Sequence, residues 1–235
     1  MAGTDAAFAG SIPALYDRHL GPLLFEPYAE RLALGVAHLS SGALLETAAG
    51  TGIVTQALGR HLPAGVRLVA TDLNQAMLDF AATKPGLARA ELRQADATAL
   101  PFDAGSFDTV VCQFGMMFFP DRVAGYREAR RVLKPGGRAC FSLWDSLAHN
   151  AIPRCVNEAL ARHLPADPPR FLARTPHGPM TRRRSDANWR KPGSGESPLK
   201  PSRCQAGPPR IGIRPSASVR AVRCGRRSRR ARHRA

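Results

Sequence analysis

Two glycines and three acidic residues have the spacing from which chemistry is expected in this 235-residue chain. Glu46 precedes Gly50 by four residues, Gly52 completes a glycine turn, and Asp72 and Asp96 follow at the ends of two later apolar segments. A glycine turn that opens a helix offers oriented N–H groups and lets a ligand approach without a Cβ in the way. Asp72, 20 residues past the turn, suits the ribose hydroxyls of a nucleoside. Asp96 is placed to accept from an adenine amino group, so the pattern predicts a nucleoside cofactor.

Two nucleoside cofactors fit this pattern, and the charges around the glycine turn favour one of them. The NAD fingerprint requires a third glycine, where this chain has Thr55. A diphosphate also disfavours a neighbouring carboxylate such as Glu46, whereas the ammonium of a methionine moiety favours one. The residues therefore predict S-adenosylmethionine (SAM).

Each of these residues also has a purely structural interpretation. The glycine turn can join a strand to a helix without any ligand. Asp72 can cap the helix that starts near Asn74, and Asp96 can cap a turn. All three acids fall at the carboxyl ends of predicted strands, which favours a ligand over these structural roles.

The elements that must position these residues alternate between strand and helix. Apolar runs predict strands at 43–49, 66–72 and 88–96, a fourth strand within 101–119 and a fifth at 138–145. Helical spacing predicts two helices within 11–38 and further helices at 53–62, 74–84 and 121–133, with a turn at 134–137. This alternation predicts an α/β fold, a doubly wound Rossmann-like parallel sheet with helices on both faces.

The segments ETAAGTG, ATDLNQAML, QADATALPF, SFDTVVCQFGMMFFPDR, REARRVLKPGGR and FSLWD occur in this order. Together they resemble the class I SAM-dependent methyltransferases of the type 11 and UbiE-like family, over roughly residues 12–178. The resemblance implies methyl transfer from SAM to a small-molecule acceptor. The cofactor-binding residues that it implies are Glu46, Ala48, Gly50, Gly52, Asp72, Leu73, Met77, Asp96, Ala97, Gln113 and Phe114. Gly50 and Gly52 would approach the methionine portion and Glu46 would anchor it. Asp72 would hold the ribose beside Leu73 and Met77, Asp96 and Ala97 would frame the adenine, and Gln113 and Phe114 would border the sulfonium.

The sequence indicates no catalytic residue. Methyl transfer from a sulfonium depends chiefly on in-line positioning, because the leaving group departs neutral. His19, His149 and His177 are candidates only by chemistry, and a surface or structural role is expected for each. Tyr16 is a candidate lid residue, with a packing aromatic as the equal alternative. Residues 146–178 show no diagnostic acceptor site, so quinone, sterol, amine or small natural product all fit.

The composition of the chain indicates its cellular compartment and limits its possible partners. No apolar run is long enough for a membrane span, and the N-terminus lacks a secretory pattern, so a cytoplasmic protein is expected. Cys112, Cys140, Cys155, Cys204 and Cys224 form no metal or disulfide pattern, which predicts reduced thiols and no metal. No feature of the sequence fixes the oligomeric state.

The net charge of +16 belongs to the C-terminal segment. Residues 179–235 hold 17 of the 34 Lys and Arg and two of the 18 acids, so residues 1–178 are close to neutral. We therefore divide the chain into a methyltransferase domain at 1–178, C-terminally incomplete, and a disordered Arg/Pro/Ser-rich tail at 179–235. The sheet is then expected to lack its last two strands.

The tail has two further interpretations. As a basic arm it would bind nucleic acid through phosphates, which is the alternative function. As the product of a frameshift in the gene it would carry no function, and the codons that the genetic code permits favour this second hypothesis. A one-base shift lets residues 188–194 encode Leu-Ala-Glu-Ala-Gly-Phe, and it lets Asp follow His near residue 180; both resemble family sequence. Nucleic-acid binding is therefore not expected.

Overall fold

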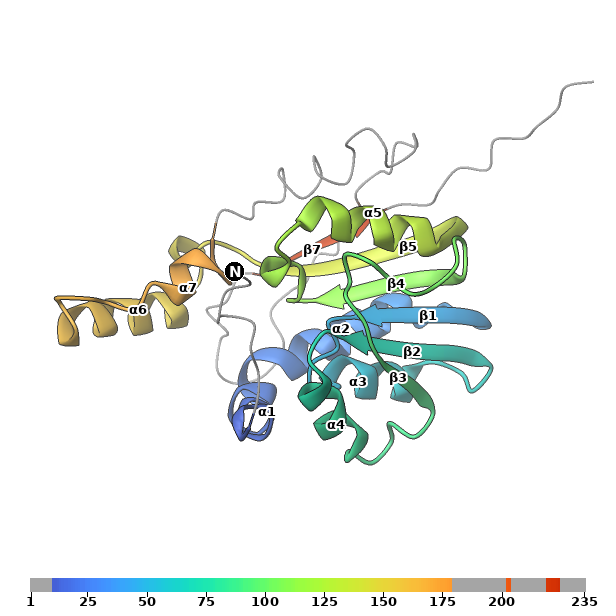
Figure 1. Cartoon of the computed structure of the whole chain (residues 1–235), viewed down its shortest axis with the longest axis horizontal. Helices are drawn as coiled ribbons and strands as arrows, with labels where there is room; N and C mark the ends of the chain where they lie inside the picture. Colours follow the sequence, from blue (N-terminus) through green and yellow to red (C-terminus); the bar gives the residue numbers. More distant parts are fainter. Residues whose placement is uncertain (1–9, 179–201, 204–218, 225–235) are drawn as a thin grey trace, which may run out of the picture.

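The computed structural model describes residues 10–178, 202–203 and 219–224, and one sheet lies at its centre (Figure 1). The strands are β1 (Gly42–Thr47), β2 (Val66–Asp72), β3 (Ala90–Gln94), β4 (Phe107–Gln113), β5 (Leu133–Trp144), β6 (Ser202–Arg203) and β7 (Val219–Cys224). Their spatial order is β3-β2-β1-β4-β5-β7-β6, and β1 to β5 pair in parallel. The predicted doubly wound α/β sheet is confirmed, with its switch point between β1 and β4.

Helices cover both faces of this sheet and one of its ends. They are α1 (Ile12–Leu15), the π-helix η2 (Tyr16–Phe25), α2 (Glu26–Val36), α3 (Ile53–His61), α4 (Gln75–Ala82), the short 3-10 helix η3 (Met116–Phe118), α5 (Arg122–Val132), the short 3-10 helix η4 (Leu147–His149), α6 (Ala151–His163) and α7 (Phe171–Arg174). In Figure 1, α6 and α7 extend beyond the carboxyl ends of the strands, on the same side as α1. This end of the sheet is where ligands bind in doubly wound folds.

Alternating residues of the strands build two separate cores. Leu45 and Val110 pack with the buried face of α5, whereas their neighbours Leu44 and Val111 pack with α2 and α3. Successive strand residues point to opposite faces, so a strand that is covered on both sides must be apolar throughout. This requirement explains the continuous apolar runs in the sequence.

The N-terminal region differs from the two helices predicted with a break at Gly21-Pro22. The chain continues through Pro22 as the π-helix η2, and the Glu26 N–H bonds to the Gly21 carbonyl. A π-helical turn moves each hydrogen bond one residue further along, so it can accommodate a proline that would break an α-helix. η2 leads directly into α2.

The turn predicted at 134–137 is an irregularity inside β5. Phe107 pairs with Leu133 and Thr109 pairs with Arg138, so the four residues between Leu133 and Arg138 face the single residue Asp108. Gly136 takes a positive φ of 87° here, a conformation that favours glycine. A β-bulge of this kind keeps the strand on the sheet while taking up extra residues.

The expectation that the last two strands are missing and that 179–235 is wholly disordered is corrected at two places. β7 pairs antiparallel with β5, from Ala139 with Cys224 to Trp144 with Val219, and β6 pairs antiparallel with β7. An uncovered edge strand presents unpaired N–H and C=O groups that any extended segment can satisfy. Composition missed this pairing, because main-chain hydrogen bonds do not need an apolar segment. The rest of 179–235 lies outside the described residues, as does most of the proposed nucleic-acid arm.

Candidate functional site

The turn between β1 and α3 adopts the left-handed backbone at three positions. Ala48, Gly50 and Gly52 have φ of 53°, 57° and 77°. A Cβ at Gly50 would meet nothing within 4 Å, so this glycine borders open space. A Cβ at Gly52 would lie 2.7 Å from Leu87 Cδ1, so this glycine is required by packing. Of the two predicted glycines, Gly50 is therefore the one that a ligand can approach.

Asp72 ties the glycine turn to the end of β2. Its Oδ2 accepts the Gly50 N–H at 2.8 Å and its Oδ1 accepts the Asn74 N–H at 2.8 Å. Burial raises the pKa of the Asp72 carboxyl above its ordinary value, although these N–H donors act in the opposite direction. Asp72 thus braces the turn rather than capping α4, whose N-cap residue is Asn74, and its side chain also reaches the cavity described below.

Glu46 lies beneath the turn. Its side chain is 1% exposed, and its Oε2 accepts a 2.7 Å hydrogen bond from Thr55 Oγ1. Burial raises the pKa of the Glu46 carboxyl to about 8; the hydrogen bond from Thr55 lowers it, and the charge of Asp72 raises it further. Thr55 is therefore the partner that the structure gives the buried Glu46 carboxyl, and the contact of Glu46 with a ligand ammonium stays a prediction.

A cavity of about 370 Å³ opens at the carboxyl ends of β1, β2 and β4. Of the residues predicted from the sequence to bind the cofactor, all except Glu46 and Gly52 line it: Ala48, Gly50, Asp72, Leu73, Met77, Asp96, Ala97, Gln113 and Phe114. The tertiary structure thus brings together side chains from four strand ends that lie up to 66 positions apart in the chain.

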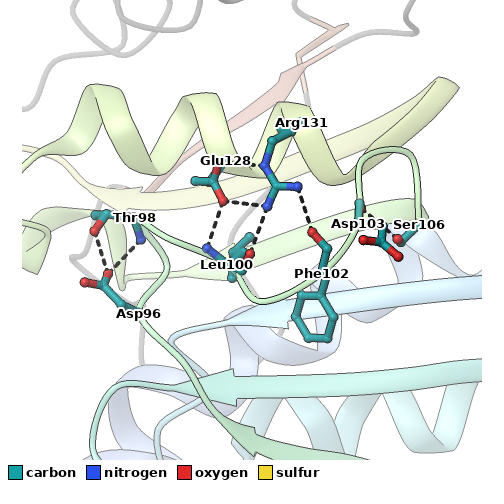
Figure 2. A network of polar contacts seen from close by, with 8 residues as sticks. All are labelled: Asp96, Thr98, Leu100, Phe102, Asp103, Ser106, Glu128 and Arg131. Atoms are coloured by element: carbon teal, nitrogen blue, oxygen red, sulfur yellow. Dashed lines mark hydrogen bonds and ion pairs between the residues drawn. The ribbon is translucent and has the colours of Figure 1, made fainter.

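Asp96 stands on a loop that an ion pair on α5 holds in place (Figure 2). Asp96 Oδ1 accepts both the N–H and the hydroxyl of Thr98 at 2.7 Å, which is the turn cap weighed above. Further along the loop, Arg131 donates to the Leu100 and Phe102 carbonyls at 2.8 and 2.7 Å, and Glu128 accepts the Leu100 N–H at 2.8 Å. Arg131 and Glu128 also pair directly at 2.7 Å. The sequence contained this pair in REARRVL, but its spacing alone did not show what it holds.

Gln113 and Phe114 end β4 at the middle of the cavity wall. Gln113 Nε2 donates to the Phe25 carbonyl at 3.1 Å, while its Oε1 is buried without a partner among the described residues. Phe114 has a φ of 56°, unusual for a residue other than glycine, and its ring stacks on Trp144 with centroids 4.0 Å apart. Backbone strain concentrates at functional sites, and an unpaired buried acceptor favours a ligand that donates a hydrogen bond.

The N-terminal helices close the cavity from above the turn. Tyr16 lines the cavity and stacks on Phe25 at 4.7 Å, and burial raises the pKa of its hydroxyl. Asp17 accepts a hydrogen bond from Thr51 Oγ1 at 2.7 Å and forms an ion pair with Lys84. The segment that carries the predicted lid residue is thus bonded to both the glycine turn and the end of α4.

The far half of the cavity is apolar and was not predicted. It is lined by Phe118, Phe119, Pro120, Trp144, Ile152, Pro153, Phe171, Leu172, Pro176 and His177. Residues 146–178, in which the sequence showed no diagnostic acceptor site, thus contribute six of these lining residues. These residues come from four separate stretches of the chain, 118–120, 144, 152–153 and 171–177, which have no common spacing, so only their convergence in space reveals the surface.

The three histidines considered from the sequence differ in their exposure to solvent. His19 and His149 are exposed, as expected. His177 is buried on the cavity wall, and its Nδ1 lies 2.8 Å from the Asp145 carbonyl oxygen. A structural role for His177 is thus present, together with access to the cavity.

The described part of the chain shows neither a membrane span nor a metal cluster. None of its helices is long and apolar enough to cross a membrane, and it contains no cluster of three or more metal-ligating side chains. Its free thiols are Cys112 and Cys140, both buried, and the exposed Cys155. Cys204 lies outside the described residues, and nothing is described of the Cys224 side chain.

Comparison with known proteins places the glycine turn inside a recognised domain. Residues 45–141 match the model of the methyltransferase domain family. The UbiE ubiquinone/menaquinone biosynthesis C-methyltransferase of Geobacter sulfurreducens is 38% identical over 128 residues, covering 53% of this chain and 50% of that protein. The demethylmenaquinone methyltransferase of Clavibacter sepedonicus is 41% identical over 104 residues, covering 44% and 41%. The chain thus spans about half the length of the curated relatives it matches.

Solved structures extend the likeness over almost the whole chain. A SAM-dependent methyltransferase from Aquifex aeolicus superposes with a TM-score of 0.62 at 14% identity, covering 90% of this chain and 97% of that one. A SAM-dependent methyltransferase from Thermotoga maritima gives 0.59 at 16% identity, covering 92% and 99%. At such identities the likeness concerns the fold.

Proposed function

We propose that this protein, whose residues 45–141 match the model of the methyltransferase domain family, transfers a methyl group from SAM to a small apolar acceptor. The observation that carries the proposal is the division of one cavity into two halves. Gly50, Asp72 and Asp96 line its polar half, and aromatic and aliphatic side chains line the other.

The polar half fits the cofactor. Asp72 would accept the ribose hydroxyls, and Asp96 and Ala97 would frame the adenine next to Leu73 and Met77. The open space at Gly50 would admit the methionine portion, and the unpaired Oε1 of Gln113 would accept a hydrogen bond there. When bound, the sulfonium supplies an electrophilic methyl group. The chain's own residues then orient the two reactants and exclude water.

The apolar half favours a flat, hydrophobic acceptor. Phe118, Phe171 and Trp144 offer ring faces and edges for such a molecule. The relatives are named for quinone biosynthesis, and an aromatic surface suits such a ring. Within the proposed class we therefore infer C-methylation of a hydroquinone with an apolar side chain.

Binding of the demethylated cofactor tests the first half of the proposal. S-adenosylhomocysteine should bind the full chain, as measured by calorimetry, and Asp72→Asn should weaken binding about tenfold to a hundredfold, because a charged acceptor is lost. Asp79→Asn on the exposed side of α4 is the matched control and should leave the affinity unchanged. Equal affinity in all three proteins would contradict the assigned site.

Turnover tests the second half. With SAM and a prenylated 1,4-naphthohydroquinone, mass spectrometry should show a product heavier by one CH2. A product that carries the methyl on oxygen would retain the class and reject C-methylation. Absence of any product, with the cofactor bound, would reject this acceptor.

A further inference from the structure

His177 lies on the apolar wall of the cavity, the part that the proposed function assigns to the acceptor. The residue follows α7, and its ring is 7% exposed on the apolar wall of the cavity. Its centroid is 5.9 Å from that of Trp144, which stacks in turn on Phe114 at 4.0 Å. These three rings form a continuous wall from the end of β4, where the sulfonium is expected, to His177.

One hydrogen bond determines which nitrogen of this ring carries the proton. His177 Nδ1 lies 2.8 Å from the Asp145 carbonyl oxygen. A carbonyl oxygen can only accept, so Nδ1 must donate, and in the neutral ring Nε2 then has a free lone pair. Asn150 Nδ2 donates to the same oxygen at 2.9 Å, and its side chain is completely buried. The acceptor that orients the histidine is therefore itself held rigidly.

The free nitrogen is available to a ligand. Nε2 makes no hydrogen bond within the described part of the chain. It is also not one of the polar atoms in that part that are both completely buried and without a partner. This nitrogen belongs to a ring that lines the cavity, and it is not completely buried.

The surroundings keep the ring neutral. Burial lowers the pKa of the His177 imidazole, although the hydrogen bond to the Asp145 carbonyl and the Asp145 carboxylate act in the opposite direction. The Asp145 carboxylate in turn lies 3.8 Å from Nδ1 of the exposed His149. A neutral imidazole with a free nitrogen in an apolar cavity has the properties of a general base.

We propose that Nε2 of His177 is the catalytic base that removes the hydroxyl proton of an aromatic acceptor during methyl transfer. The proposal rests on the proposed function, and it adds a catalytic residue to a site for which the sequence indicated none. The acceptor must therefore carry an ionisable hydroxyl on a ring that fits against Trp144, Phe118 and Phe171.

Methyl transfer to the acceptor releases one proton, and His177 takes it up. The acceptor O–H bond breaks, its electron pair stays on the acceptor, and the proton forms an N–H bond on Nε2. The acceptor then attacks the methyl carbon through its oxygen or its ortho carbon, and the C–S bond breaks with its pair left on sulfur. After attack through carbon, the ring proton moves to the oxygen by tautomerisation. In either case one proton remains on His177 and later passes to water.

The decisive variant separates the base from the hydrogen bond. His177→Asn keeps an N–H donor close to the position of Nδ1 for the Asp145 carbonyl, and it removes Nε2. With the naphthohydroquinone above, kcat should fall by about 10²-fold to 10⁴-fold, while S-adenosylhomocysteine affinity stays within about twofold. His149→Asn, at the neighbouring exposed histidine, is the control and should retain wild-type kcat. Wild-type kcat in His177→Asn would overturn the proposal and leave His177 a structural residue.

A pH profile and an NMR measurement distinguish loss of the base from loss of the folded structure in a variant. Wild-type kcat should rise with pH to a plateau above the lowered histidine pKa, and His177→Asn should lose this step. In the 15N spectrum of the ligand-free chain, Nε2 of His177 should be unprotonated, and its signal should shift when the naphthohydroquinone joins bound S-adenosylhomocysteine. A protonated Nε2, or a signal that the acceptor leaves unchanged, would overturn the proposal without any turnover. Failure of S-adenosylhomocysteine to bind would instead reject the proposed function.

Discussion

The main-chain N–H of Gly50 donates a 2.8 Å hydrogen bond to Oδ2 of Asp72, and this bond joins the β1 turn to the end of β2. The same carboxylate accepts the Asn74 N–H through its other oxygen. One side chain thus sets the shape of the turn and presents charge to the cavity. Its two roles can be separated by experiment.

Asp72→Ala should lower the free energy of unfolding even without cofactor. The substitution leaves the Gly50 and Asn74 N–H groups without their acceptor, which costs about 1–3 kcal/mol for groups of this kind. Urea unfolding of the ligand-free protein measures the loss. Asp72→Asn should lose less, because its amide oxygen still accepts one N–H. Equal stability of both variants and wild type would show that the two bonds contribute nothing.

The stability of the ligand-free protein should fall as pH rises, because of Glu46. Its pKa is raised from 4.5 to about 8, so between these values the folded state keeps a proton that the unfolded state has released. Stability is therefore largest below about pH 4.5 for this group and is lost as pH passes through 8. Glu46→Gln should flatten this dependence and raise Tm at pH 8.5 by at least about 3 °C.

Glu158→Gln is the matched control for that measurement. Glu158 is an exposed glutamate on α6, 3.8 Å from Arg154. Its substitution should leave the slope of Tm against pH unchanged between pH 5 and 8.5. If Glu46→Gln shows the wild-type slope as well, Glu46 does not hold a proton in the folded state.

Ala48→Gly should stabilise the protein by about 0.5–1 kcal/mol. Ala48 adopts a φ of 53°, which costs a residue with a Cβ roughly 1–2 kcal/mol, partly offset by the greater unfolded-state entropy of glycine. The adjacent Ala49 takes no positive φ, so Ala49→Gly should be destabilising by about 0.5–1 kcal/mol. Chemical denaturation of the two variants compares them directly. The same sign of change in both would contradict the strain at Ala48.

Arg131→Gln should weaken cofactor binding from a distance. The Arg131 guanidinium bonds the Leu100 and Phe102 carbonyls, and Glu128 accepts the Leu100 N–H, so the loop that carries Asp96 depends on this pair (Figure 2). Loss of these charge-assisted bonds should cost about 2–3 kcal/mol of stability and reduce S-adenosylhomocysteine affinity severalfold. Arg127→Gln, on the exposed side of the same helix, should change neither quantity.

The frameshift hypothesis for residues 179–235 stays a prediction. It expects a one-base difference in the gene between the codons for His177 and Thr181, after which the chain would continue in the family's reading frame. Sequencing several independent clones across these codons measures it. An intact frame in every clone would reject the hypothesis and make the β7 pairing part of the natural sheet.

The sequence by itself determined the parallel sheet and most of one half of the cavity. Apolar runs marked the five parallel strands because a strand covered on both faces must be apolar throughout. Glycines and acids at the strand ends marked the half of the cavity that we propose holds the cofactor, because parallel strands bring their carboxyl ends to one edge. Gly50, Asp72 and Asp96 were therefore located by local pattern alone, whereas Glu46 and Gly52 share that pattern but face the protein interior.

Only the tertiary structure decided the apolar half, the pairing of β7 with β5 and the position of His177. Trp144, Phe171 and His177 come from different segments, and nothing in their spacing requires them to meet. Main-chain pairing at an edge depends on which hydrogen-bonding groups are left free, not on composition. The tautomer of His177 depends on a carbonyl 32 positions earlier in the chain, so its chemistry became visible only once the two were placed side by side.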